Sequence, residues 1–280
     1  MNPSDAYAPA ALKCRQAGSG PAVLCLHSSG GSSAQWKALT GRLARGHRVI
    51  APDFLGHAGS PAPVAGGGTV LEQDTAQVAA IAAAHGRVHV VGHSYGAAVA
   101  LRLALEHPRL VRSMVLYEPV VFGALDGDGV DASLWQEITQ VGRTIVMHAR
   151  LSRLLASARL FVDYWSGAGS WPAPGAARQG TVALRMPTVA AHFSALFGWQ
   201  PMPALRNLRV PLLLVHGERT RRVAAVVAAR LAEALPAAER LRIGGAGHMG
   251  PLTHAGAFEH AVLHFVTARD EAAVPLPLAA

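Results

Sequence analysis

Ser94 lies in the sequence Gly92-His-Ser-Tyr-Gly96, between an apolar run at 88–91 and an Ala- and Leu-rich segment that begins at Tyr95. The pattern Gly-x-Ser-x-Gly is weak by itself, because a chain with 29 glycines can contain it by chance. Between a strand and a helix, however, a tight turn strains the backbone of the central residue and projects its side chain, and flanking glycines leave room for that turn. The start of a helix also favours developing negative charge. We therefore predict that Ser94 is a nucleophile rather than an ordinary serine cap of a helix.

The chain contains 14 histidines, and His248 is the one whose position suits a general base. It lies in the sequence Gly245-Ala-Gly-His-Met-Gly-Pro251, after the last expected strand and after the serine in chain order. A histidine in such a loop can take the proton of a serine hydroxyl. His27 and His93 belong to turns near the site, where we expect positioning roles, and His216 lies at the end of an expected strand.

The elements that must position these residues follow from an alternation of short apolar runs with longer Ala- and Leu-rich segments, which is typical of a parallel sheet with crossover helices. The expected strands are 11–16, 22–27, 48–53, 88–93, 113–118, 211–216 and 239–243, and the expected helices are 73–85, 95–106 and 222–235. Several strand ends carry Gly, Ser, His, Asp or Glu, which places the site at the carboxyl edge of the sheet.

Two further motifs, in the right order with the serine turn and the histidine loop, resemble the α/β-hydrolase family. Leu26-His-Ser-Ser-Gly30 resembles that family's loop after the third strand, and Pro52-Asp-Phe-Leu-Gly-His-Ala-Gly-Ser60 resembles its turn after the fourth strand. Ser28 and Ala58 stand where the family usually has glycine. The resemblance implies an α/β fold with a mostly parallel central sheet flanked by helices and an inserted helical cap.

The resemblance also implies an oxyanion hole formed by the backbone N–H groups of Ser29 and Tyr95. Two donors aimed at a tetrahedral oxyanion are worth several kcal/mol, and the loss of one costs about 10²- to 10³-fold in rate. A hydroxyl of Ser28 or Ser29 is a candidate third donor.

The acid of the expected triad departs from the family pattern. The family's acid follows the strand 211–216 as Gly-x-x-Asp, whereas this chain has Gly217-Glu-Arg-Thr220 there, and no aspartate occurs between Asp163 and Asp270. Threonine cannot carry the negative charge that stabilises an imidazolium.

Glu118 and Glu218 are the two carboxylates that could replace it. Glu118 ends the strand 113–118, from which some α/β-hydrolases take their acid, and Glu218 lies two residues before the usual position. We favour Glu118, because a carboxylate at the end of an apolar strand needs a partner to offset its desolvation. The alternative for Glu118 is an ion pair with a nearby arginine.

The alternation of strands and helices breaks between 122 and 200. A Gly- and Asp-rich loop at 123–129 opens this segment, followed by a helical pattern at 132–165, a Gly- and Pro-rich stretch at 166–180 and a second helical run that ends near Gly198. We interpret 122–200 as a helical cap, 1–121 and 201–270 as the core domain, and 271–280 as a flexible tail.

The expected cap is rich in aromatic residues, which indicates an apolar substrate, although most of them must form the cap's own core. These residues are Phe122, Trp135, Phe161, Tyr164, Trp165, Trp171, Phe193, Phe197 and Trp199. We expect the side chains of Tyr95, Trp165 and Met249 to line the substrate pocket.

Composition excludes several classes of function. The 280 residues are 51% hydrophobic and 15% charged, so a large core is expected, and the net charge of +8 comes from scattered arginines, without the basic stripe of a nucleic-acid binder. Cys14 and Cys25 cannot build a disulfide framework, and we see neither a signal peptide nor an apolar stretch that would span a membrane. We expect a cytoplasmic monomer or homodimer.

The sequence predicts a serine hydrolase, a carboxylesterase for an apolar small molecule, which needs no cofactor or metal. Phosphate-binding loops, dinucleotide fingerprints and zinc spacings do not occur. Serine at position 94 argues against the epoxide hydrolases and dehalogenases of this fold, which use an aspartate nucleophile. Two alternatives stay open: a C–C bond hydrolase of aromatic-degradation products, whose glycine run is only partly supplied by His27-Ser-Ser-Gly-Gly31, and a non-catalytic ligand-binding protein of the same fold.

Overall fold

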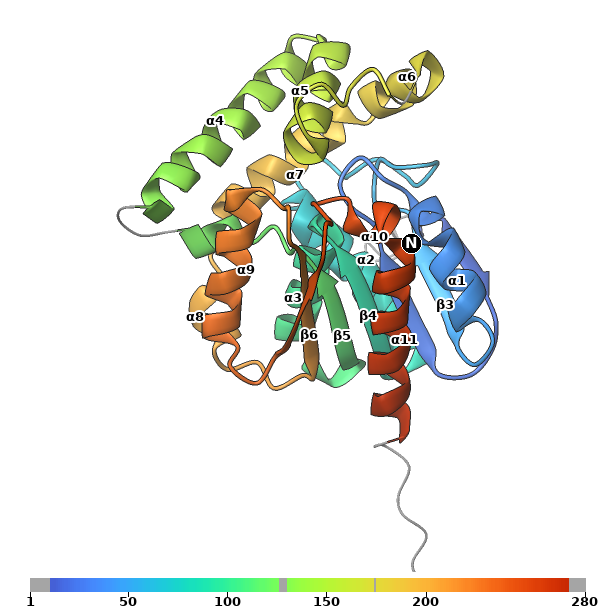
Figure 1. The fold of residues 1–280 in the computed structure, drawn as a ribbon. Coiled ribbons are helices and arrows are strands. Elements are labelled where there is room, and N and C mark those ends of the chain that lie inside the picture. Colours follow the sequence, from blue (N-terminus) through green and yellow to red (C-terminus); the bar gives the residue numbers. More distant parts are fainter. Residues whose placement is uncertain (1–10, 126–129, 174, 272–280) are drawn as a thin grey trace, which may run out of the picture.

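The computed structural model describes residues 11–125, 130–173 and 175–271 and has a central sheet (Figure 1). In these residues the sheet has seven strands in the order β1-β3-β2-β4-β5-β6-β7, of which β1 pairs antiparallel and the others pair parallel. The strands are β1 (Cys14–Ala17), β2 (Ala22–Leu26), β3 (Arg48–Pro52), β4 (Val88–His93), β5 (Val111–Tyr117), β6 (Leu212–Gly217) and β7 (Glu239–Ile243). The predicted α/β class with a mostly parallel sheet is confirmed.

The parallel register brings the carboxyl ends of the central strands together. His93 of β4 is paired with Tyr117 of β5, and Tyr117 is in turn paired with Val215 of β6. Every residue of β4 is buried, because helices cover both faces of the sheet. Residues that directly follow β4, β5 and β6 therefore meet at one edge.

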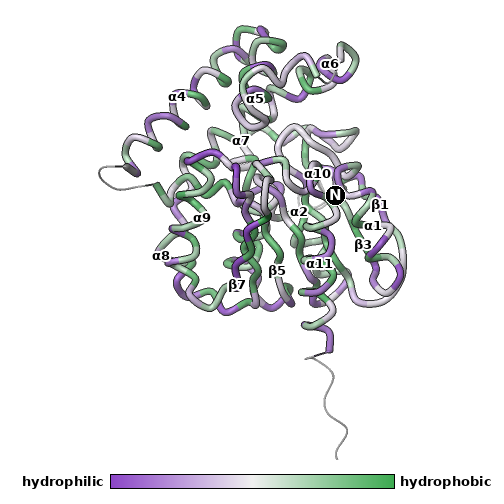
Figure 2. The backbone as a smooth tube through the Cα atoms, in the orientation of Figure 1, coloured by the Kyte–Doolittle hydropathy of each residue, from purple (hydrophilic) through white to green (hydrophobic). Residues whose placement is uncertain are grey.

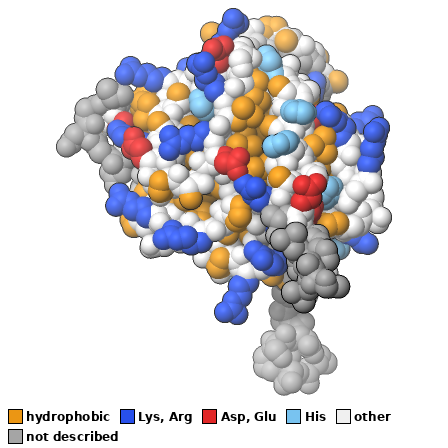
Figure 3. Space-filling model, turned by 60° about the horizontal axis from the view of Figure 1, so that its bottom comes forward, with side chains coloured by type: hydrophobic (Ala, Val, Ile, Leu, Met, Phe, Trp, Pro, Cys, Tyr) orange, Lys and Arg blue, Asp and Glu red, His pale blue; other side chains and the backbone are white. Residues whose placement is uncertain are grey.

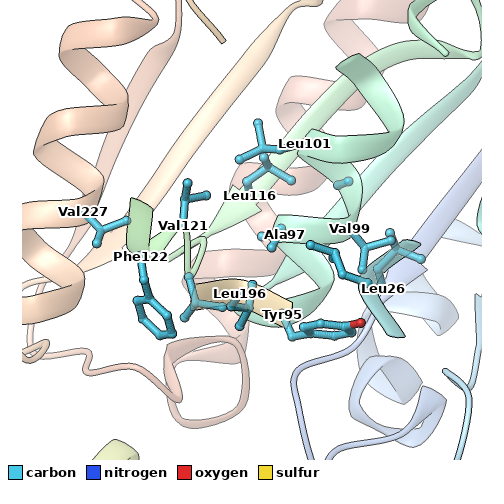
Figure 4. Packing of buried hydrophobic residues seen from close by; sticks show 14 of the residues in the cluster. Leu26, Tyr95, Ala97, Val99, Leu101, Leu116, Val121, Phe122, Leu196 and Val227 are labelled. Carbon is cyan, nitrogen blue, oxygen red and sulfur yellow. The ribbon is translucent and has the colours of Figure 1, made fainter. Parts of the chain in front are cut away.

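Helices cover the two faces of the sheet with separate apolar clusters. One cluster joins β2, β4 and β5 to α2 (Val70–His85), α3 (Tyr95–Glu106) and α9 (Arg222–Ala234), and part of it is drawn in Figure 4. The other joins the opposite face to α1 (Lys37–Leu43) and α11 (Ala255–Glu271). Figure 2 shows the resulting pattern, with hydrophobic residues concentrated in the strands between the helical layers. The short helices α8 (Met202–Leu205) and α10 (Gly250–Thr253) complete this part of the chain.

Four helices between β5 and β6 lie beyond the carboxyl ends of the strands (Figure 1), and we refer to them as the cap helices. They are α4 (Val130–Arg150), α5 (Leu154–Ser166), α6 (Ala176–Leu184) and α7 (Met186–Gly198). The expected helical run at 132–165 is divided between α4 and α5, where Ser152 has a φ of 55°. The proposed domain limits at 122 and 200 stay a prediction.

Parts of three predicted segments lie outside the described ranges. They are the first ten residues of the core domain, residues 126–129 of the expected loop at 123–129, and all but Glu271 of the expected tail at 271–280. Within the described ranges, no helix combines the length and the apolar character needed to cross a bilayer. The face drawn in Figure 3 carries Lys and Arg side chains that are spread over the surface rather than gathered in one stripe.

Candidate active site

Ser94 occupies the sharp turn between β4 and α3. Its φ of 56° and ψ of −114° lie in a region that L-residues rarely adopt, and its backbone N–H donates to the Tyr117 carbonyl at 3.0 Å. The turn requires both flanking glycines: a Cβ on Gly96 would lie 2.3 Å from the Leu26 carbonyl oxygen, and one on Gly92 would lie 2.7 Å from the Ala97 backbone. The predicted strand–turn–helix context of the serine is therefore present.

His248 lies in the loop after β7 and faces this serine. Its Nε2 is 3.0 Å from Ser94 Oγ, and the residue is only 5% exposed. His93 supports the loop, because its Nε2 is 2.8 Å from the His248 carbonyl oxygen and its Nδ1 accepts from the Gln35 amide at 3.0 Å. Burial lowers the pKa of His93 to about 3, so this ring is neutral and donates its Nε2–H to the carbonyl.

Glu118 lies against the other side of the His248 ring. Its Oε2 is 2.7 Å from His248 Nδ1 and accepts from the Thr220 hydroxyl at 2.7 Å, and its Oε1 accepts from the Gly217 N–H at 2.8 Å. Burial raises the pKa of Glu118, but the hydrogen bonds from His248, Gly217 and Thr220 outweigh it and hold that pKa below its ordinary value. The carboxylate is ionised beside the imidazole.

Glu218, the alternative acid, points elsewhere. Its carboxylate accepts from the Gly245 N–H at 2.9 Å and lies 3.5 Å from the Arg242 guanidinium, at an exposed position. Thr220 fills the position where the family has its aspartate and donates to Glu118 instead. The structure therefore brings Glu118, and not Glu218, to His248.

The loop at 28–31 borders the serine, and both of its serine hydroxyls already have partners. Ser28 Oγ donates to the Gln35 amide oxygen at 3.1 Å, and Ser29 Oγ lies 2.6 Å from His192 Nδ1. In the described part of the chain, no acceptor is paired with the backbone N–H of Ser29 or of Tyr95. Both N–H groups are therefore unpaired in the described residues, whereas both hydroxyls are engaged.

His27 lies behind this loop, as expected for a positioning residue. Its Nδ1 is 2.8 Å from the Ser28 carbonyl oxygen, and its Nε2 accepts from the Phe54 N–H at 3.0 Å. Complete burial lowers the pKa of His27 well below its ordinary value, so the ring is neutral with its proton on Nδ1. His216 is half-buried at the end of β6, where burial lowers its pKa.

A cavity of about 400 Å³ opens over Ser94 and His248 between the 28–31 loop and the cap helices α5 and α6. Its walls combine the apolar groups of Phe161, Trp165 and Met249 with small polar side chains. The Trp165 ring lies against His248, with 4.1 Å between the ring centroids. Trp165 and Met249 thus line the cavity, as we predicted.

The expectation for Tyr95 is wrong. Its side chain is 0% exposed and lies among the buried hydrophobic residues drawn in Figure 4, and it is not part of the cavity wall. The hydroxyl donates to Asp74 at 2.8 Å and the ring stacks on His192 with 3.6 Å between centroids. The stacking and the hydrogen bond hold the Tyr95 side chain in the core, so it does not line the cavity.

Two cationic side chains also line the cavity, and neither was expected. Arg178 lies on α6 and Arg185 directly before α7, and no Asp or Glu is among the described residues of the cavity wall. Arg185 Nη1 donates to the carbonyls of Gly30 and Gly31, both at 2.7 Å. The ranges that the structure describes contain no group of three His, Cys, Asp or Glu side chains arranged to hold a metal ion.

Sequence reasoning missed His192, Asp74 and Arg185. All three lie outside the recognisable motifs, on elements that reach the site only after folding. His192 is the one ionisable residue in the run Met186–Gly198, which is a signal that could have singled it out.

Comparison with known proteins gives one family match over most of the chain. The model of a family described as alpha/beta hydrolase fold matches residues 21–255. The chain is 31% identical to the dihydrolipoyllysine-residue acetyltransferase component of an acetoin cleaving system from Cupriavidus necator, over 87% of this chain and 63% of that protein. It is 28% identical to the 2-hydroxymuconate semialdehyde hydrolase of a Pseudomonas species, over 92% of this chain and 90% of that one.

Among solved structures, the enol-lactonase from Burkholderia xenovorans LB400 is similar with a TM-score of 0.75 and 21% identity, covering 91% of this chain and 96% of that one. At this identity the likeness concerns the fold alone. Curated relatives with 38% and 43% identity are aligned with this chain over only 30% and 37% of their own length.

Proposed function

The chain belongs to the alpha/beta hydrolase fold family, and on that premise we propose that it is a serine hydrolase that cleaves a carboxylic ester of an apolar substrate. The observation that carries the proposal is a continuous chain of contacts: Ser94 Oγ lies 3.0 Å from His248 Nε2, and His248 Nδ1 lies 2.7 Å from Glu118 Oε2. A nucleophile, a base and an orienting acid within hydrogen-bond distance are the arrangement that acyl transfer requires.

In the first step, Ser94 Oγ attacks the ester carbonyl while His248 Nε2 takes the hydroxyl proton. The ionised Glu118 keeps the other proton on Nδ1 and stabilises the imidazolium that forms. The negative charge on the carbonyl oxygen is met by the backbone N–H groups of Ser29 and Tyr95, the latter at the start of α3. His248 then passes its proton to the leaving alcohol, which departs and leaves an acyl group on Ser94.

In the second step, water takes the place of the alcohol. His248 removes a proton from the water, the hydroxide attacks the acyl carbonyl, and the proton returns to Ser94 Oγ as the acid leaves. No cofactor enters either step.

Phe161, Trp165 and Met249 support an apolar acyl or alcohol group, because they supply the large apolar surfaces around the reacting atoms. A cavity of about 400 Å³ suits a small molecule better than a polymer.

Arg178 and Arg185 favour a second candidate, a C–C bond hydrolase. A cavity wall with two guanidinium groups and no acidic side chain among its described residues suits a substrate that carries a carboxylate. The Pseudomonas relative is named for 2-hydroxymuconate semialdehyde, which contains a carboxylate, and 2-hydroxy-6-oxo-dienoates of that kind are the substrates to test beside the esters.

The experiment is hydrolysis of p-nitrophenyl esters from acetate to dodecanoate by the wild type and by two pairs of variants. We expect Ser94→Ala and His248→Asn to lower kcat by at least about 10⁴-fold. The matched controls Ser170→Ala and His254→Asn alter residues outside the cavity wall and should stay within about twofold, since surface substitutions of this kind have small effects. Turnover of the dienoate but of no ester would select the C–C hydrolase, and turnover unaffected by Ser94→Ala would reject both.

A further inference from the structure

The cap helix α7 contacts the two residues whose N–H groups form the expected oxyanion hole. His192, in the middle of α7, lies 2.6 Å through Nδ1 from the hydroxyl of Ser29, and its ring stacks on Tyr95 with 3.6 Å between centroids and 7° between planes. The two partners come from different strand ends, after β2 and after β4. One side chain from the cap therefore touches both sides of the hole.

The chemistry of the His192 ring defines its contact with Ser29. Complete burial lowers the pKa of His192 well below its ordinary value, so the ring is neutral and carries one proton. Nε2 has no hydrogen-bond partner in the described chain but lies 3.9 Å from the Asp74 carboxylate, which favours placing the proton there. Nδ1 is then an acceptor, and the Ser29 hydroxyl donates to it.

The surroundings hold the ring in that orientation. His192 also stacks on His57, with 5.3 Å between the ring centroids, and His57 Nε2 accepts from the Gly30 N–H at 3.2 Å. Asp74 is itself fixed by hydrogen bonds from the Tyr95 hydroxyl at 2.8 Å and the Leu55 N–H at 3.0 Å. The stacked, neutral rings of His192 and His57 thus hold residues 29 and 30 through one hydrogen bond each.

The peptide that carries the Ser29 N–H is fixed as well. The carbonyl of Ser28, in the same peptide plane, accepts from the Gly31 N–H at 3.0 Å and lies 2.8 Å from His27 Nδ1. Because C=O and N–H point in opposite directions in a trans peptide, these bonds set the direction of the Ser29 N–H. What remains to be set is the position of residue 29 relative to Tyr95, and His192 contacts both.

We propose that His192 is a positioning residue for the oxyanion hole: by accepting from the Ser29 hydroxyl while stacked on Tyr95, it fixes the distance between the two donor N–H groups. The inference rests on the proposed function, since it takes those N–H groups as the oxyanion donors. A ring that only filled space would need no acceptor atom at Nδ1, and phenylalanine would serve there equally well.

The test measures the rate at which a fluorophosphonate probe modifies Ser94, a reaction that needs the oxyanion hole but no knowledge of the substrate. Ser94 Oγ forms the new P–O bond, the P–F bond breaks, fluoride leaves and His248 takes the proton. Three variants separate the roles: His192→Phe keeps a ring without an acceptor, His192→Asn keeps an acceptor near the position of Nδ1 without the ring, and Ser29→Ala removes the donor. Phe193→Leu, on the same helix but outside the cavity wall, controls for loss of cap packing.

We expect His192→Phe and Ser29→Ala each to slow labelling by about tenfold or more, because small displacements of reacting groups have effects of this size. The double variant should be no slower than either single one, since both remove the same contact. His192→Asn should label faster than His192→Phe but more slowly than the wild type, because it keeps the acceptor and loses the ring that stacks on Tyr95. Phe193→Leu should label within about twofold of the wild type.

Wild-type rates in His192→Phe and Ser29→Ala would overturn the proposal, as would effects that multiply in the double variant or a His192→Asn variant as slow as His192→Phe. An unlabelled wild type would overturn it too, because no working oxyanion hole would exist. If labelling follows the expected pattern while no ester is hydrolysed, the ester assignment alone fails. Thermal unfolding of each variant identifies any that is not folded.

Discussion

Among single residues, Glu118 carries the most specific prediction, because its role depends on contacts that Glu218 does not share. Glu118→Gln should lower kcat by about 10³- to 10⁴-fold, since an amide beside His248 stabilises neither the imidazolium nor the tautomer with its proton on Nδ1. The measurement is kcat for the best p-nitrophenyl ester under saturating conditions.

Glu218→Gln is the matched control for that substitution. Its carboxylate contacts Gly245 and Arg242 rather than His248, so kcat should stay within about twofold of the wild type. If Glu218→Gln were the damaging change and Glu118→Gln the mild one, the assignment of the acid would be reversed.

Thr220→Val tests how much the residue in the family's acid position contributes to Glu118. The hydroxyl donates to Glu118 Oε2 at 2.7 Å, and its removal leaves a buried carboxylate oxygen with fewer donors. We expect kcat to fall by about three- to tenfold, less than in Glu118→Gln, because the charge itself stays in place. The control is Thr144→Val on α4, whose hydroxyl donates only within its own helix, and a Thr220→Val variant no slower than this control would contradict the prediction.

The contrast between Glu118 and His192 explains which site residues a sequence can reveal. Ser94 and His248 are set by short motifs, and Glu118 by its place at a strand end, so chain order was enough to nominate them. His192 and Arg185 reach the site through the packing of the cap on the sheet domain, and their spacing in the sequence does not indicate that contact. The prediction for Tyr95 was wrong because its backbone directly follows Ser94, whereas its side chain packs in the core.

For whole elements, the sequence predicted the sheet far better than the helices that surround it. Each expected strand lies within a few residues of an observed one, and the buried parallel strands β2, β4 and β5 are predicted well because they are nearly continuous apolar runs. Helix α3 begins and ends as predicted, because the serine turn and Pro108 bound it. Helix α11 was not predicted, although its buried face packs on α1 and β5.

Helix α5 gives a prediction about substrate size, because Trp165 forms the part of the cavity wall next to His248. Trp165→Leu should widen the cavity there and move the optimum of the p-nitrophenyl ester series to acyl chains about two to four carbons longer. The readout is kcat/KM across chain lengths.

The matched control is Trp171→Leu. Trp171 lies between α5 and α6 and does not contribute to the cavity wall. This variant should leave the optimum where it is in the wild type. An unchanged optimum in Trp165→Leu would place the acyl group in another part of the cavity.

Across the molecule as a whole, the site depends on an unusual number of buried neutral histidines. His27, His57, His93 and His192 are each 0% exposed, and burial lowers the pKa of each, to about 4 for His57 and about 3 for His93. A histidine with a lowered folded-state pKa binds its proton only after unfolding. The stability that it contributes is complete above its unfolded pKa, near 6.5, and is lost as the pH falls toward the folded value.

Asp74 acts in the opposite direction. Burial raises its pKa to about 7, so between about pH 4 and pH 7 the folded state holds a proton that the unfolded state releases. This residue alone would make the fold more stable as the pH falls through that range. Asp74 is one group, whereas the buried histidines are four, so the histidines determine the sign of the change in stability with pH.

We therefore expect the free energy of unfolding to fall by about 3 kcal/mol between pH 6 and pH 5, which corresponds to a net uptake of between two and three protons on unfolding. Urea unfolding at pH 7, 6 and 5 and constant ionic strength, followed by tryptophan fluorescence, measures this slope. In Asp74→Asn, which keeps a hydrogen-bonding side chain without the titration, the loss over the same interval should grow to about 5 kcal/mol. A free energy of unfolding that does not change from pH 7 to pH 5 would mean that these histidines are protonated in the folded state. It would also contradict the assignment of a neutral His192 that accepts from the Ser29 hydroxyl.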